Sequence, residues 1–235
     1  MRHTKMVIIA VMVVLFMSYG MSWASYFKSY TPVVTGGTAY DFEGQVEGTL
    51  ISNQYAGVTF GQAPSAGRPQ IDNYSWLFGY GSSSGSAVLT GSTEGGYSSP
   101  TVAGITGTFA SGVSEFQAFF SDTSPLGNYT VYAYGTGDTL LESFTILTSE
   151  ILPPGYGGGF FPPPGTSPLP GLYVGFQRGS ADIIRVQIGP SAASGDAFAI
   201  DDFQFKTAAV PEPISMLLLG FGLTGLAVLR ARGRK

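Results

Sequence analysis

The side chains that could do chemistry in this chain are carboxylates, hydroxyls, amides and aromatic rings. The only histidine is His3, and cysteine is absent. Beyond residue 3 the chain therefore cannot form a Ser-His-Asp or Cys-His catalytic site, a zinc site built on His or Cys, or a disulfide. Carboxylates remain, either as ligands for a cation or as an acid and base pair.

A set of carboxylates forms the first candidate site. In the stretch 197–205 the apolar side chains are at even positions first, Phe198 and Ile200, and then at odd positions, Phe203 and Phe205. Because a slip of one residue turns side chains to the other face of a sheet, this pattern predicts a β-bulge between them. If the terminal strands pair, the bulge gathers several oxygen ligands of the kind that calcium prefers, although turn amides could equally bind one aspartate and leave the others solvated. The predicted ligands of a structural calcium are Asp41, Glu43, Asp201 and Asp202.

A second candidate site combines an aromatic ring with polar groups, as glycan sites do. Asp72, Asn73 and Trp76 lie within five residues of one another. The alternative is that Trp76 fills the core beside a turn, as large aromatic side chains often do. A carboxylate-based glycosidase would need an acid and a base that flank the scissile bond, and no pair in the sequence stands out for that role. We therefore expect a non-catalytic protein.

Charge limits the partners of the region between residues 25 and 209. Five Lys and Arg residues stand there against 14 Asp and Glu residues. An acidic surface disfavours nucleic acid and anionic lipid, and suits a protein that meets cations and neutral glycans.

The elements that must position these side chains are β-strands. Short alternating runs separated by Gly, Ser, Asn and Asp recur from residue 40 onward, which favours a β-sandwich, most simply a jelly roll. The strands are predicted at 57–60, 86–90, 105–109, 114–120, 129–134, 140–147, 172–176, 184–188 and 197–205. Each is expected to bury one face, with Glu115 and Gln117, for example, on the exposed face of their strand. The Pro- and Gly-rich stretch 152–171 is predicted to be a surface loop.

Both ends of the chain resemble targeting segments. Arg2 and Lys5 precede an apolar stretch, and Ser22 and Ala24 fit the small-residue positions before a signal-peptidase cut. This predicts a signal peptide over 1–24, with a helical apolar region, and a mature chain that starts at Ser25. An uncleaved N-terminal anchor is the alternative.

The C-terminal stretch 210–235 has three parts. It begins with Val210-Pro211-Glu212-Pro213, continues with the apolar run 214–229, and ends with a basic cluster. At about 1.5 Å per residue the run spans roughly 24 Å, against a hydrocarbon core of about 30 Å, so it predicts a short transmembrane helix. The positive-inside rule places the cluster in the cytoplasm and the preceding chain across the membrane. The cluster consists of Arg230, Arg232, Arg234 and Lys235.

This three-part tail resembles the PEP-CTERM sorting signal of Gram-negative bacteria. The resemblance implies export with processing by signal peptidase, passage through the inner membrane, and removal of the tail by an exosortase. It implies a final location at the cell surface or outside the cell. The tail of this family is also labelled an ice-binding protein C-terminal domain. That name describes no activity, so it does not predict ice binding by this chain.

A looser resemblance covers nearly all of the region between the two targeting segments. Short blocks at 41–44, 54–60, 131–134 and 199–203 look like the lectin-like jelly-roll domains found ahead of such tails. The resemblance implies a shape like that of carbohydrate-binding modules, many of which hold a structural calcium where the first and last strands meet.

Together these observations predict a non-catalytic, exported surface or extracellular-matrix protein that associates with exopolysaccharide. A calcium-stabilised carbohydrate-binding module with one defined glycan is the sharper alternative, and a glycosidase is the remote one.

Overall fold

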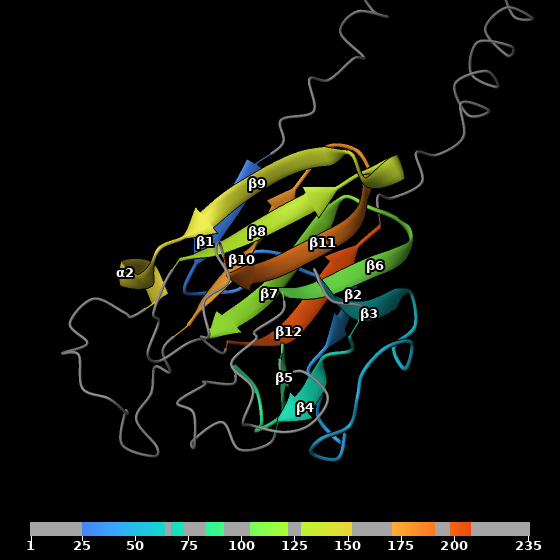
Figure 1. Ribbon diagram of the computed structural model, residues 1–235. Helices are drawn as coiled ribbons and strands as arrows, with labels where there is room; N and C mark the ends of the chain where they lie inside the picture. The colour runs from blue at the N-terminus through green and yellow to red at the C-terminus, as the bar shows by residue number, and fades with distance from the viewer. Residues whose placement is uncertain are drawn as a thin grey trace, which may run out of the picture.

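The computed structural model describes residues 25–63, 67–72, 83–91, 104–121, 128–151, 171–190 and 198–207. Within them the chain is a jelly-roll-like β-sandwich of two antiparallel sheets packed face to face (Figure 1). The predicted signal peptide 1–24 and tail 210–235 lie outside these residues, as does all of the predicted loop 152–171 except Gly171. Among the described helices, none is long and apolar enough to cross a membrane.

The larger sheet has seven strands and the smaller has five. The larger runs in the order β1 (Ser25–Ser29), β10 (Leu172–Gln177), β7 (Glu115–Ser121), β12 (Ala199–Lys206), β5 (Val88–Thr90) and β4 (Gln70–Asp72), with β2 (Thr38–Tyr40) also paired to β12. The smaller runs in the order β3 (Val58–Ala63), β6 (Gly104–Val113), β11 (Ile183–Pro190), β8 (Tyr129–Tyr134) and β9 (Leu140–Ile146). Two short helices, η1 (Thr136–Asp138) and α2 (Thr148–Ile151), flank β9.

The predicted strands are confirmed, since each of the nine ranges overlaps a strand of the sandwich. The strands β1, β2 and β4 were not anticipated. They contain three to five residues; β1 and β2 lie beside the longer strands β10 and β12, and β4 lies beside the equally short β5. A run this short carries too little alternation to be recognised, and it becomes a strand because a neighbour supplies hydrogen bonds.

The core lies between the sheets and is rich in aromatic side chains. Phe203 of β12 is buried, with its ring centroid 4.8 Å from that of Phe60 on the opposite sheet and 5.0 Å from that of Phe116 on its own sheet. Burial of each large apolar side chain contributes roughly 1.5–3 kcal/mol, so these rings hold the two layers together.

The predicted exposure of Gln117 is wrong. Its side chain is 1% exposed, although it lies on the face of β7 that points away from the core. The backbone amides of Val33 and Val34 donate to its Oε1, and its amide donates to Gln204 Oε1 at 2.8 Å. The connection between β1 and β2 thus covers the outside of the larger sheet. Alternation within one strand contains no information about such a cover.

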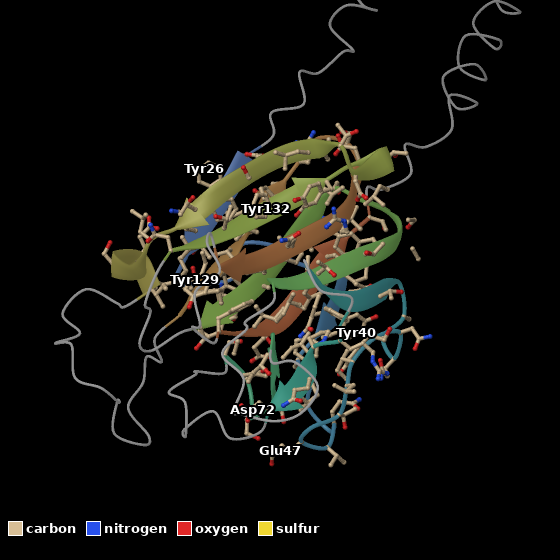
Figure 2. The ribbon with its side chains drawn as sticks, viewed as in Figure 1. Tyr26, Tyr40, Glu47, Asp72, Tyr129 and Tyr132 are labelled. Atoms are coloured by element: carbon tan, nitrogen blue, oxygen red, sulfur yellow. The ribbon has the colours of Figure 1, made fainter. Side chains whose placement is uncertain are left out.

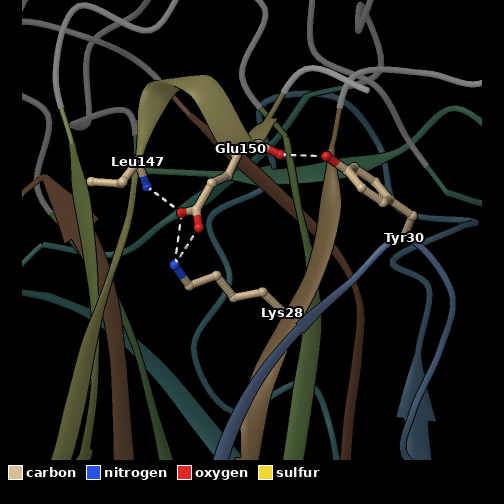
Figure 3. Close-up of polar contacts among 4 residues, drawn as sticks. All are labelled: Lys28, Tyr30, Leu147 and Glu150. Atoms are coloured by element: carbon tan, nitrogen blue, oxygen red, sulfur yellow. Dashed lines mark hydrogen bonds and ion pairs between the residues drawn. The ribbon is translucent and has the colours of Figure 1, made fainter. Parts of the chain in front are cut away.

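An ion pair attaches the N-terminal strand to the rest of the sandwich (Figure 3). Lys28 Nζ lies 2.7 Å from Glu150 Oε2, which also accepts the backbone amide of Leu147, and the Tyr30 hydroxyl donates to the Glu150 carbonyl. Partial burial opposes ionisation of Glu150, but the hydrogen bonds from Lys28 and Leu147 outweigh it and lower the pKa of the carboxyl. The chain is therefore fixed from its first described residues onward.

Candidate functional site

The predicted bulge in β12 is confirmed. The pairing of β12 with β7 changes register between Asp201 and Gln204, and Asp202 has a φ of 44°. The bulge keeps both Ile200 and Phe203 buried, which the change of apolar phase required. It occurs where β12 changes partner on its other side, because Ile200 pairs with β5 and Phe203 pairs with β2.

The two aspartates of the bulge bind a segment that is distant in the sequence. The backbone amides of Ser83 and Ser84 donate to Asp201 Oδ2 at 2.9 and 3.0 Å. Their hydroxyls reach Asp202, with Ser83 Oγ 2.7 Å from Oδ2 and Ser84 Oγ 3.2 Å from Oδ1. The segment lies where β12 changes partner from β5 to β2. Without the two carboxylates, the backbone amides of Ser83 and Ser84 would have no acceptor in the gap between these strands.

Glu43 binds the same segment. The backbone amides of Ser86 and Ala87 both donate to Glu43 Oε1 at 2.7 Å. Asp41 contributes indirectly, since its Oδ1 accepts the backbone amide of Glu43 at 3.2 Å. The structure therefore brings Glu43, Asp201 and Asp202 to one stretch of chain, 83–87, and we call these three side chains the carboxylate cluster.

Burial sets the electrostatics of the carboxylate cluster. Asp201 is fully buried, which raises the pKa of its carboxyl to about 6, even though the backbone amides of Ser84 and Asp202 stabilise the charged form. The Tyr173 hydroxyl donates to Asp202 Oδ2 at 2.8 Å, and burial followed by this bond raises the pKa of Tyr173 to about 12. Tyr173 is therefore a constant donor at physiological pH.

Backbone amides already use several oxygens of the carboxylate cluster. In the part of the chain that the structure describes, no group of three or more His, Cys, Asp or Glu side chains is placed to hold a metal ion. Both oxygens of Asp201 already accept backbone amides, including that of Asp202 at 2.7 Å. Calcium at Asp41, Glu43, Asp201 and Asp202 stays a prediction from the sequence.

The predicted glycan site is only partly within the described residues. Asp72 ends β4 and is 2% exposed, whereas Asn73 and Trp76 lie outside the described residues. The sorting residues Val210, Pro211, Glu212 and Pro213 and the basic cluster Arg230, Arg232, Arg234 and Lys235 lie outside them as well.

The structure also shows an aromatic surface that was not singled out from the sequence. Tyr132 and Tyr134 of β8 lie on the outer face of the smaller sheet with their rings stacked, 6.0 Å apart and 24° from parallel (Figure 2 labels Tyr132). The guanidinium carbon of Arg185 lies 3.9 Å from the centre of the Tyr134 ring. Arg185 also pairs with Asp138 at 2.9 Å and reaches Gln187 Oε1 at 3.4 Å. We call Tyr132, Tyr134, Arg185 and Gln187 the tyrosine face.

The strand pattern contained the signal for this face. Val131 and Ala133 are buried, so the alternate positions of β8 must point outward, and the same holds for Arg185 and Gln187 around the buried Val186. The alternation within each strand could not predict the register between β8 and β11. That register sets Tyr134 opposite Arg185 and Tyr132 opposite Gln187.

Comparison with solved structures finds chains that match this one at low sequence identity. The chain is similar to the K2 cleaved adhesin domain of Lys-gingipain, with 16% identity over 73% of this chain and 98% of that one and a TM-score of 0.45. It is also similar to the C-terminal family 22 carbohydrate-binding module of Clostridium thermocellum Xyn10B, with 14% identity over 77% and 99% of the chains and a TM-score of 0.40. A third match is the K1 cleaved adhesin domain of Lys-gingipain from Porphyromonas gingivalis W83, with 14% identity over 80% of this chain and 99% of that one and a TM-score of 0.34. Since every TM-score is below 0.5, the fold assignment depends on the strand pairing itself.

Sequence comparison identifies the C-terminal tail. No curated protein is significantly similar to the chain in sequence. The family model for the PEP-CTERM protein-sorting motif, however, matches residues 209–235. The chain therefore carries a PEP-CTERM sorting signal behind a jelly-roll-like β-sandwich, which indicates an exported, cell-surface-targeted protein that is sorted by exosortase.

Proposed function

We propose that this chain is a non-catalytic surface or extracellular-matrix protein that associates with exopolysaccharide. The observation that carries the proposal is the sorting motif at 209–235, because it indicates that the sandwich is exported toward the cell surface. Signal peptidase and exosortase are its partners during export, and the inner membrane holds it only as an intermediate.

The composition of the sandwich supports this function. Beyond His3 the chain has neither His nor Cys, which removes the commonest nucleophile and metal-based mechanisms. The surplus of carboxylates between residues 25 and 209 disfavours nucleic acid as a partner. A polar β-sandwich without such sites is suited to binding or spacing within a hydrated matrix.

Fractionation of the host tests the proposal. The complete chain should leave the inner membrane and sediment with isolated exopolysaccharide, whereas a chain shortened after Ala209 should not reach the cell surface. A control with Lys235→Ala should behave like the complete chain, because three arginines remain in the basic cluster. Retention of the complete chain in the inner membrane, or its separation from the polysaccharide, would contradict the proposal.

A carbohydrate-binding module stabilised by calcium is the second candidate function. The observation in its favour is that Glu43, Asp201 and Asp202 all bind the segment 83–87, which follows the stretch with Asp72 and Trp76 in the chain. This candidate expects saturable binding of one glycan, loss of binding in Trp76→Ala, and a melting temperature that falls when calcium is chelated. An unchanged melting temperature and no heat on calcium titration would remove the calcium part.

Catalysis is tested separately. The remote alternative, a glycosidase that uses carboxylates, would release reducing ends from the host polysaccharide. Their appearance in proportion to the amount of protein would contradict the non-catalytic proposal.

A further inference from the structure

The outer face of the smaller sheet has a composition unlike that of the acidic domain that carries it. The strand register places Thr59, Thr108, Arg185, Tyr134 and Leu140 side by side in one row across five strands. The next row contains Thr106, Gln187, Tyr132 and Ser143. In these two rows the side chains are hydroxyls, one amide, one guanidinium, two phenol rings and one exposed leucine. The nearest carboxylate is that of Asp138, which neutralises Arg185.

This composition limits what the face can bind. A divalent cation would require several carboxylate or carbonyl ligands. Nucleic acid would require several unpaired cations, which the two rows lack. A tightly bound protein would require a cluster of apolar anchors, whereas the rows contain Leu140 alone beside the two tyrosines. A neutral glycan presents hydroxyl groups and the apolar faces of its sugar rings. Its chemistry matches the hydroxyl, amide and aromatic groups of this face.

Within the tyrosine face, Tyr132 is the ring best placed for stacking. The ring of Tyr134 packs against both Arg185 and Tyr132. Among the described residues, Tyr134 is the only ring that packs on Tyr132, no cation lies over it, and its side chain is partly exposed. Because Tyr134, which itself packs against Arg185, stacks on this ring, a ligand that binds Tyr132 would have less side-chain motion to restrict.

We propose that the tyrosine face binds a neutral polysaccharide, with a sugar ring stacked on Tyr132 and sugar hydroxyls bonded to Arg185 and Gln187. The inference rests on the proposed association with exopolysaccharide and assigns it a site. It differs from the site expected around Asp72, Asn73 and Trp76.

Affinity electrophoresis of the protein purified from its host tests this site. The probes in the gels are xylan, mixed-linkage β-glucan, dextran and the neutral fraction of the host exopolysaccharide. At least one should retard the wild type, and Tyr132→Ala should weaken that binding about tenfold, which corresponds to about 1.4 kcal/mol. Tyr132→Phe keeps the ring and should bind like the wild type.

A matched control separates binding from stability. Tyr26→Ala also removes a half-exposed tyrosine that stacks on another ring, Phe144 at 4.7 Å, but Tyr26 belongs to the other sheet. It should leave binding unchanged. Arg185→Ala provides a second variant of the face should Tyr132→Ala not fold, and it too should weaken binding.

Two results would overturn the site. One is retardation by none of the four probes, and the other is a folded Tyr132→Ala or Arg185→Ala variant that binds like the wild type. The proposed function fails in a different way, namely when the wild type does not sediment with host exopolysaccharide. Wild-type sedimentation that persists in a folded Tyr132→Ala variant would leave the function standing and remove this site.

Discussion

The carboxylate cluster and the tyrosine face represent two ways of using polar side chains in one sandwich. In the cluster, Glu43 and Asp201 accept backbone amides of the segment 83–87, so these carboxylates bind the protein's own chain. On the tyrosine face, Tyr132 and Gln187 remain half-exposed beside a stacked ring and a cation. The comparison suggests that the more strongly charged group stabilises the fold, while the more neutral face is available to a ligand.

Removal of Asp201 should have the largest effect on stability. Asp201→Ala leaves the backbone amides of Ser83, Ser84 and Asp202 without their acceptor, and should lower the free energy of unfolding by about 3 kcal/mol. Urea denaturation followed by circular dichroism measures this change. The control is Asp138→Asn, which removes an exposed carboxylate at a φ of 57° and should change stability by less than about 0.5 kcal/mol. If Asp201→Ala and Asp138→Asn changed the free energy of unfolding by the same small amount, the carboxylate cluster would not stabilise the fold.

The pH dependence of stability should show the second largest effect. A carboxyl group whose pKa is higher in the folded than in the unfolded state binds its proton more tightly when folded, so protonation stabilises the fold. With a folded pKa of about 6, Asp201 should add about 2 kcal/mol to the free energy of unfolding as pH falls from 7.5 to 4.5. The Glu150 and Asp182 carboxyls, whose pKa values are lowered, act in the opposite direction near the acid end.

The contribution of Asp201 is isolated by subtracting the pH profile of Asp201→Asn from that of the wild type in urea denaturation. A difference that stays constant from pH 7.5 to 4.5 would show that burial does not raise the pKa of the Asp201 carboxyl.

A smaller effect is expected on the tyrosine face. Tyr134→Ala removes one stacked ring and one cation–π contact, and should lower the free energy of unfolding by about 1 kcal/mol. Thermal unfolding monitored by near-ultraviolet circular dichroism provides the measurement. If this variant were destabilised as much as Asp201→Ala, the tyrosine face would be a structural element and the contrast between the two regions would disappear.

The smallest effect is expected at the ion pair between Lys28 and Glu150. Both side chains are partly exposed, at 21% and 35%, so Lys28→Ala should change the free energy of unfolding by about 0.5 kcal/mol or less. High salt should reduce the difference further, because screening weakens surface pairs. A large, salt-independent loss would indicate that this pair, like the carboxylate cluster, is effectively buried.

The positions of single strands, and of the bulge within β12, could be predicted from the sequence. Alternation located β8 and β11, and the change of apolar phase located the bulge beside Asp201. Contacts between strands could not be predicted, because alternation contains no information about register or neighbours. The burial of Gln117 under Val33 and Val34 is one such case, and the Arg185 side chain over the Tyr134 ring is another.

By itself, the sequence determined where the protein is sent, which catalytic chemistry is absent, and which runs form strands, since these depend on local residue types and spacing. The tertiary structure alone decided what each polar side chain does. Ser83 and Asp201 are 118 positions apart, and they meet only because β5 pairs with β12 beside the bulge. The carboxylates of the bulge thereby accept hydrogen bonds from a segment that is distant in the chain, and two tyrosines at alternate positions form a stacked surface.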